Sequence, residues 1–272
     1  GRKQTPEWFA WKHRRGPWGP SVGWVVEDGA ERIVGARLFV PWRLRAGGMT
    51  VETHRAMDGA VLPIAQRQGL FTRTIRAEME CKAEGRRPAH LTYSTSVPAS
   101  REAYRELGWT IATIPHVATL AYPSMRKAAD VVWDDALDHE YPRVSHTELR
   151  TDWSASALRW RLSPQSGLKY RKVRLRRSDT PHGAVVRVTE LRRCRTLAVV
   201  HTWGDERTVT TLVRAAATRT ACPLLLSVET APGLWHRAVG SSTVSLWSPS
   251  EETTASVREA LRFDLADLEG VM

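Results

Sequence analysis

The sequence contains one loop that could bind an anion: Gln66-Arg67-Gln68-Gly69, which follows an apolar run ending at Val61 and a proline. Apolar residues recur at helical spacing from Phe71 to Met79, so a helix is expected to begin just after the loop. The amides of the loop and of the first helical turn would then lack carbonyl partners and would point toward one spot. With the helix dipole and the charges of Arg67 and Arg73, these amides would form a phosphate site.

One glycine is weaker evidence than a complete nucleotide-binding motif. The lysine of a Walker loop is absent, and no acidic residue is placed to bind the ribose of a dinucleotide. Nucleotide hydrolysis and Rossmann-type redox chemistry are therefore disfavoured.

Cysteine and histidine do not suggest a metal site. Cys81, Cys194 and Cys222 are odd in number, far apart and without CxxC spacing, and the 9 histidines form no HxH or HxxxH pair. We expect no metal and no disulfide framework, and we interpret the cysteines as small buried residues.

The elements around the loop alternate between strands and helices. A hairpin is predicted over residues 21–44, followed by an extended segment over roughly residues 52–61 and, after the loop, by the helix. Another strand covers residues 89–97, and Ser100 is expected to cap a second helix that ends at Gly108. This order predicts an α/β (α+β) fold.

The second half of the chain repeats the opening theme. Residues 8–26 and 157–175 both contain a tryptophan, a basic residue, a proline, a glycine and then a strand. Further strands and a helix follow in the order of the first half, so we interpret the chain as two copies of one α/β unit. The polar segment 124–151 is expected to connect them, which gives domains 1–136 and 137–272.

In order and spacing, the segments "VLPIAQRQGLFTRTI" and "YSTSVPASREAYRELGW" resemble the GCN5-related N-acetyltransferases. The pyrophosphate loop of that family reads Q/R-x-x-G-x-G/A, and residues 66–71 match it except that Phe71 replaces the last small residue. Val97 stands where the family usually has an asparagine after its next strand. The resemblance covers residues 17–123 and implies two tandem domains, each a mixed sheet flanked by helices.

The resemblance implies acetyl-coenzyme A as the cofactor, held in a V-shaped opening between two splayed strands of the first domain. A backbone amide near Ala60 or Val61 would stabilise the oxyanion formed when an amine attacks the thioester directly, and Tyr104 would protonate the departing thiolate. The cofactor-binding residues that it implies are Ala60, Val61, Gln66, Arg67, Gln68, Gly69, Leu70, Phe71, Thr72, Ser94, Thr95 and Tyr104.

The second domain is expected to be degenerate, because Asp205 and Glu206 at its loop position would oppose a phosphate. It would shape the substrate site without holding a cofactor of its own.

The amine must lose a proton, and the strand before Val61 offers three acceptors. Alternation along a strand would place Glu52, His54 and Asp58 on one face, with Asp58 nearest the opening. Asp58 and His54 are therefore the candidate bases, and water is the alternative.

The acceptor is the least specified part of the prediction. Trp8, Trp11 and Trp160 could line a groove for a peptide or an amino sugar, or could pack in the core. The net charge is +11, and residues 159–179 contain eight basic residues and one acid, which predicts a positive face. Such a face favours a neutral or acidic acceptor, such as a small peptide or a natural-product amine, over a polycation.

Three functions remain open. The first is an acetyl-coenzyme A-dependent N-acetyltransferase; the second is a Fem-like aminoacyl or peptidyl transferase that uses aminoacyl-tRNA; the third is a non-catalytic basic binding module. Nucleic acid is an expected partner only in the tRNA-dependent alternative. No apolar run nears the roughly 18 residues of a membrane span, so a cytoplasmic location is expected.

Overall fold

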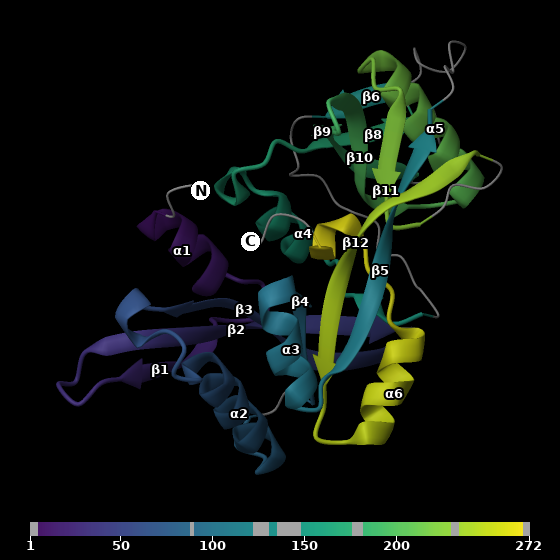
Figure 1. The fold of residues 1–272 in the computed structure, drawn as a ribbon. Coiled ribbons are helices and arrows are strands. Elements are labelled where there is room, and N and C mark those ends of the chain that lie inside the picture. Colours follow the sequence, from purple (N-terminus) through teal and green to yellow (C-terminus); the bar gives the residue numbers. More distant parts are fainter. Residues whose placement is uncertain are drawn as a thin grey trace.

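The structure is a computed structural model that describes residues 5–87, 90–121, 131–134, 148–175, 182–229 and 234–268. These residues form an α+β fold in which helices cover a large mixed sheet (Figure 1). The strands are β1 (Val22–Glu27), β2 (Ile33–Ala46), β3 (Met49–Val61), β4 (Leu91–Ser96), β5 (Thr110–Leu120), β6 (Val131–Asp134), β7 (Arg150–Thr151), β8 (Arg171–Leu175), β9 (Gly183–Leu191), β10 (Cys194–Trp203), β11 (Leu224–Ser227) and β12 (His236–Trp247). The helices are α1 (Pro6–His13), α2 (Leu70–Ala83), α3 (Pro98–Glu106), α4 (Ala155–Leu162), α5 (Glu206–Arg219), α6 (Glu251–Ala260) and α7 (Leu265–Leu268), with short 3-10 turns η1 (Pro63–Ala65) and η3 (Pro164–Ser166).

The sheet contains the same arrangement of strands and helix twice. In the first unit β1, β2 and β3 are antiparallel neighbours, and α2 connects β3 to the parallel strand β4. In the second unit β8, β9 and β10 are antiparallel neighbours, and α5 connects β10 to the parallel strand β11. All of them belong to one sheet, in the order β1-β2-β3-β4-β12-β5-β11-β10-β9-β8-β6.

The two units exchange strands at the centre of this sheet. Strand β12 lies between β4 and β5 and is antiparallel to both, while β5 is also antiparallel to β11. The predicted boundary between residues 136 and 137 lies outside the described residues. Because β12 belongs to the second predicted domain and extends the sheet of the first unit, a boundary there does not separate two independent sheets.

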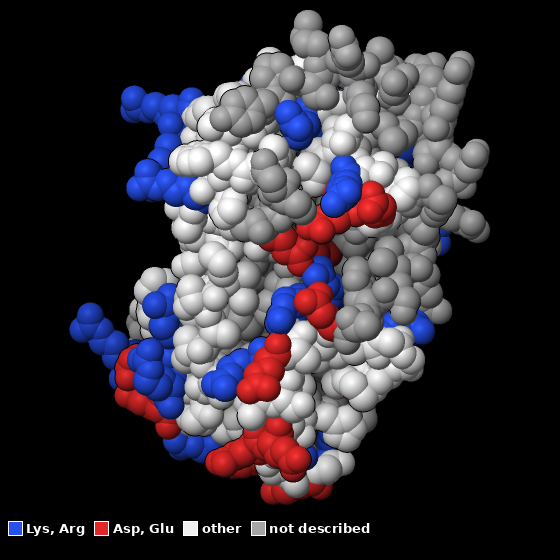
Figure 2. All heavy atoms as spheres, turned by 90° about the vertical axis from the view of Figure 1, so that its right-hand side faces the viewer, with Lys and Arg blue, Asp and Glu red and all other residues white. Residues whose placement is uncertain are grey.

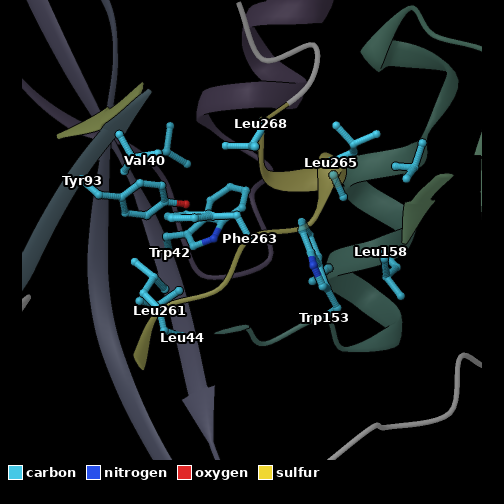
Figure 3. Packing of buried hydrophobic residues seen from close by; sticks show 14 of the residues in the cluster. Val40, Trp42, Leu44, Tyr93, Trp153, Leu158, Leu261, Phe263, Leu265 and Leu268 are labelled. Atoms are coloured by element: carbon cyan, nitrogen blue, oxygen red, sulfur yellow. The ribbon is translucent and has the colours of Figure 1, made fainter. Parts of the chain in front are cut away.

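The largest hydrophobic core lies between the two units and is rich in tryptophan. Figure 3 shows Phe263 and Leu265, from the C-terminal segment, between Trp42 and Tyr93 on one side and Leu158 of α4 on the other. The C-terminal segment therefore joins the halves through burial of apolar area as well as through β12.

Most predicted elements are confirmed, including the hairpin, the helix after Gly69 and the left-handed Gly108 (φ 77°) that follows α3. The prediction that Ser100 caps α3 was wrong. The helix begins at Pro98, after Val97, because proline suits the first turn of a helix, and the Ser100 hydroxyl donates to the Val97 carbonyl at 3.1 Å.

The cysteines are free, and Cys81 and Cys222 are buried as predicted, whereas Cys194 is half-buried. None of the helices in the described ranges combines the length and the hydrophobicity that a bilayer span requires.

Candidate functional site

Strands β3 and β4 diverge in a V, as the resemblance implied. They pair in parallel only from Thr53 opposite Leu91 to Arg55 opposite Tyr93. Two side-chain hydrogen bonds link them further: the hydroxyl of Ser94 donates to the carbonyl of Ala56 at 3.1 Å, and Arg55 Nη2 donates to the hydroxyl of Thr95 at 3.4 Å. Beyond this point β3 continues along β2, while β4 pairs with β12. The edge of β3 that faces β4 is therefore left without a described strand partner.

A β-bulge in β3 lies beside this opening. Its register against β2 passes from Met57 opposite Leu38 to Ala60 opposite Ala36, so two residues of β3, Asp58 and Gly59, oppose one residue of β2. Asp58 has a φ of 49°, in the left-handed region. A bulge of this kind re-aims side chains at the end of a strand.

The bulge overturns the prediction that Glu52, His54 and Asp58 share one face. Figure 1 shows α1 and α2 on opposite sides of strands β1 to β3. His54 faces α2, where its Nδ1 lies 3.1 Å from Glu78 Oε1, and Asp58 faces α1. Glu52 forms an exposed pair with Arg43 of β2, 2.8 Å between Oε1 and Nε. The alternation holds up to Met57 and fails there because the bulge adds a residue.

Asp58 is held by two side chains of α1, the ammonium group of Lys12 and the imidazole of His13. Its Oδ2 lies 2.6 Å from Lys12 Nζ and 2.7 Å from His13 Nε2, and His13 Nδ1 lies 2.9 Å from the hydroxyl of Ser21. Although burial alone would raise it, the hydrogen bond with His13 and the charge of Lys12 lower the pKa of Asp58. Asp58 is therefore a stable carboxylate and a weak proton acceptor, and it fastens α1 to the bulge.

His54 is also a weak base, because burial lowers its pKa while the hydrogen bond to Glu78 opposes that effect. The side chain is 7% exposed. Of the two predicted bases, only Asp58 lies at the bulge, and neither has the raised proton affinity that general base catalysis at neutral pH favours.

The buried lysines predict an unusual pH dependence of stability. Burial lowers the pKa of Lys12 and of Lys82 to about 8. Since an unfolded lysine titrates near pH 10.4, the unfolded chain binds more protons than the folded protein between about pH 8 and 10, and the free energy of unfolding should rise with pH there. We expect this rise to be on the order of 1 kcal/mol larger for the wild type than for Lys12→Met in urea unfolding at pH 7.5 and 9.5. An equal rise in the free energy of unfolding of the two proteins would contradict this prediction.

The loop between β3 and α2 presents unpaired amides. Gly69 caps the N-terminus of α2 with φ 69° and has no side chain to accept from the helix. The amides of residues 69–72 donate no hydrogen bond to any described residue. A Cβ built on Gly69 meets no atom within 4 Å, so the space in front of these amides is open. Gln66 supports the loop by donating from Nε2 to the Val61 carbonyl at 3.2 Å.

This donor set fits a diphosphate. Four amides converge at the positive end of α2, and the exposed guanidinium groups of Arg67 and Arg73 flank them. The corresponding loop of the second unit is closed: Asp205 caps α5 by accepting from the Thr208 amide at 2.8 Å, and a Cβ on Gly204 would overlap His182. The first loop therefore has free amides that can bind an anion. In the second loop, the Thr208 amide already donates to the side chain of Asp205.

Tyr104 lies beneath the splay and is fully buried (0% exposed). Its hydroxyl accepts a hydrogen bond from Nη2 of Arg37, and its ring packs edge-on against Phe71, 5.8 Å between ring centroids. Phe71 stands where the expected loop motif has a small residue, and its ring packs against Tyr104.

Arg37 is a site residue that the sequence analysis missed. Its side chain is 6% exposed, and its Nε has no hydrogen-bond partner among the described residues. A Cβ on Gly59 would overlap the Arg37 guanidinium, so the glycine of the bulge makes room for it. Burial lowers the pKa of Arg37. Gly59 could have indicated this position in the sequence, because a glycine within a strand often marks a bulge or a close approach of another group to the backbone.

The predicted tryptophan groove is not formed. Trp11 and Trp160 are 3% and 8% exposed, and each indole Nε1 donates to the other residue's backbone carbonyl at 2.8 Å. Both belong to the core, and the prediction that they bind substrate was wrong. Trp8 is half-buried, with Lys12 Nζ 4.6 Å from its ring centroid.

The basic run 159–179 does not act as one surface. Arg161 and Lys172 are buried, Arg159 and Lys169 are exposed, and residues 176–181 lie outside the described ranges. On the face drawn in Figure 2, Lys and Arg side chains adjoin Asp and Glu side chains instead of forming one positive patch.

Comparison with solved structures assigns the fold. A GCN5-related N-acetyltransferase from Anabaena variabilis matches with a TM-score of 0.57 and 12% identity over 83% of this chain and 62% of its own. Eis1 from Mycobacterium abscessus matches with a TM-score of 0.62 and 15% identity over 93% and 69% of the two chains. This chain has the fold of the GCN5-related N-acetyltransferases (GNAT). A probable N-acyltransferase from Enterococcus faecalis shares the GNAT fold, with a TM-score of 0.59 and 10% identity over 86% of this chain and 63% of its own.

Among the comparisons with known proteins, only those with solved structures give a match. No family model matches the chain, and no curated protein sequence matches it either. The chain spans 62% of the length of the Anabaena GNAT structure. Within its own GNAT fold, the splay, the bulge and the free amides meet in the first unit.

Proposed function

We propose that this chain is an acetyl-coenzyme A-dependent N-acetyltransferase whose acceptor is the primary amine of a small peptide or natural product. The observation that carries the proposal is the set of unpaired amides at Gly69–Thr72, at the N-terminus of α2 and next to a splayed strand pair. A GNAT fold with such an anion site in one unit suits a cofactor that combines a diphosphate with an extended tail.

In this mechanism the first unit binds and orients. The amides of residues 69–72, with Arg67 and Arg73, hold the diphosphate, and the unpaired edge of β3 beyond Arg55 faces the tail. When bound, acetyl-coenzyme A supplies an activated thioester. A backbone amide near Ala60 or Val61 would donate to the thioester oxygen, where negative charge would develop.

Tyr104 would supply the proton that the thiol leaving group of the cofactor needs, and Arg37 would position Tyr104. Because the phenol oxygen accepts from Nη2 of Arg37, its own proton is directed toward another acceptor. The guanidinium also stabilises negative charge that develops on the phenol as it gives up that proton. Proton removal from the amine is left to water, since the pKa of Asp58 is lowered.

Tyr104→Phe tests this role. We expect kcat to fall by about 100-fold, the usual contribution of a general acid, while the Kd of acetyl-coenzyme A changes by less than about threefold. The matched control is Tyr170→Phe, which removes another buried tyrosine hydroxyl held by an arginine, Arg161 Nη1 at 3.2 Å, in the second unit. An unchanged kcat in Tyr104→Phe would rule the role out.

The proposed function itself is tested by calorimetry with acetyl-coenzyme A and a mass-spectrometric screen of amine acceptors. Micromolar binding and appearance of an acetylated amine are the expected results. Absence of binding, together with tRNA binding that weakens steeply as salt rises, would favour the tRNA-dependent alternative. Absence of any turnover with intact cofactor binding would favour a non-catalytic binding module.

A further inference from the structure

The second unit contains a cavity of about 370 Å³ in the place that corresponds to the splay of the first. Strands β10 and β11 pair in parallel from Thr196 opposite Leu224 to Ala198 opposite Leu226 and then separate. The cavity lies beyond that point, between these strands and α5. Its wall includes Thr119, Val199, His201, Val213, Leu225 and Asp264.

The cavity also has the bulge that accompanies the first splay. The register of β10 against β9 shifts between Val199 and His201, so Val200 is the extra residue, just as Asp58 and Gly59 interrupt β3. The second unit therefore retains the crevice of the fold, and its volume falls in the range of small-molecule sites.

The charge of this crevice is opposite to that of the first. Glu206, Glu229 and Asp264 all line it, and the one arginine of its wall, Arg150, is engaged with two of them: its Nη2 lies 2.6 Å from Glu229 and its Nη1 3.5 Å from Asp264. Carboxylates outnumber guanidinium groups in the described wall, so a cation is attracted and a phosphate is repelled. The side chain of Asp205 caps α5 and accepts from the Thr208 amide, so this amide cannot donate to an anion.

One buried polar group in the described wall, the Thr119 hydroxyl, lacks a hydrogen-bond partner. Thr119 is 1% exposed. His201 is 8% exposed; its Nδ1 lies 2.6 Å from Asp264 Oδ2, while its Nε2 bonds to no described residue. Buried polar atoms are rarely left unpaired, so the Thr119 hydroxyl points to a ligand that supplies the missing partner.

We propose that this cavity binds a small molecule with a protonated amine and an apolar body. The ammonium group would donate to Glu206, Glu229 or Asp264 and to the free Nε2 of His201, while the body packs against Val199, Val213 and Leu225. Four strands, β4, β12, β5 and β11, separate the two splays, which amounts to about 19 Å across the sheet. The bound amine is therefore too far away to be acetylated in place, and the site is a second one, independent of acetyl transfer.

The test is calorimetry on the full chain with 2-phenylethylamine, tryptamine, cyclohexylamine and cadaverine, with phenylacetate as the anionic counterpart. At least one amine should bind saturably, at one equivalent and with a Kd of about 0.1 to 1 mM, and phenylacetate at least about tenfold more weakly. Lack of saturable binding by all four amines, or equal binding of phenylacetate, overturns the proposal.

Variants of the exposed carboxylates and of the apolar wall locate the site. Glu206→Gln combined with Glu229→Gln removes two exposed carboxylates and should weaken amine binding about tenfold, whereas Glu252→Gln on α6 should not change it. Val213→Trp should abolish binding by filling the cavity. Gly69→Glu should leave amine binding intact, which separates this site from the first. Amine binding that survives Val213→Trp, or that acetyl-coenzyme A displaces, overturns the assignment.

Discussion

Replacing Gly69 with glutamate is expected to weaken the binding of acetyl-coenzyme A by at least about 100-fold, equivalent to roughly 2.7 kcal/mol. Gly69 has a φ of 69°, and nothing lies within 4 Å of its Cβ position, so a side chain there has open space at the N-terminus of α2, where the free amides lie. A glutamate places a carboxylate where the diphosphate must lie, where it competes for the same donors and repels the ligand. Calorimetric titration of acetyl-coenzyme A into both proteins measures the effect.

Gly85→Glu is a matched control at the other end of the same helix. Gly85 also has a φ of 69° and also has open space at its Cβ position. Both substitutions impose the same left-handed strain, about 1 kcal/mol. A carboxylate is favourable at the N-terminus of a helix and unfavourable at its C-terminus, so Gly85→Glu should be the less stable variant. If Gly69→Glu binds the cofactor as the wild type does, or if Gly85→Glu loses binding equally, the loop is not the diphosphate site.

The anion loop could be predicted from sequence because its signals are local. The proline after Val61, the glycine at position 69 and the helical spacing after it each act within a few residues, and the structure has a strand, a turn and a helix there. Helix N-termini leave amides unpaired whatever the rest of the fold does. The location of the free amides followed from these facts alone.

The faces of β3 could not be predicted in the same way. Strict alternation would place Asp58 beside His54, but the extra residue at the bulge turns Asp58 toward Lys12 and His13. A bulge depends on what the partner strand presents, here Arg37, and that pairing is not visible in either segment alone. The polar network at the site therefore came from tertiary structure.

The pairing of β12 with the first unit could not be predicted from the sequence either. The repeat of two units could be seen in the sequence, but nothing near residues 236–247 indicates that β12 crosses into the first unit to pair with β4. Long-range pairing of this kind is stabilised when both faces of a central strand are buried, which depends on the whole fold. The domain boundary drawn from a polar segment missed it for that reason.

The junction between the units leads to the largest expected effect on stability, that of Trp160→Ala. The indoles of Trp11 and Trp160 stack at 5.4 Å between ring centroids, and each donates to the other residue's carbonyl at 2.8 Å. Removing a buried tryptophan leaves a large cavity, which costs about 3–5 kcal/mol in comparable cores. Here it also leaves the Trp11 carbonyl without its donor.

Urea unfolding followed by circular dichroism measures that loss without relying on tryptophan fluorescence. Trp235→Ala is the control, since Trp235 is 57% exposed and its replacement should change the free energy of unfolding by less than about 0.5 kcal/mol. Trp160→Phe keeps an aromatic ring and removes the hydrogen bond, so its cost should be intermediate, about 1–2 kcal/mol. A Trp160→Ala protein as stable as Trp235→Ala would mean that the two units do not depend on this pair, and that β12 and the C-terminal segment hold them together without it.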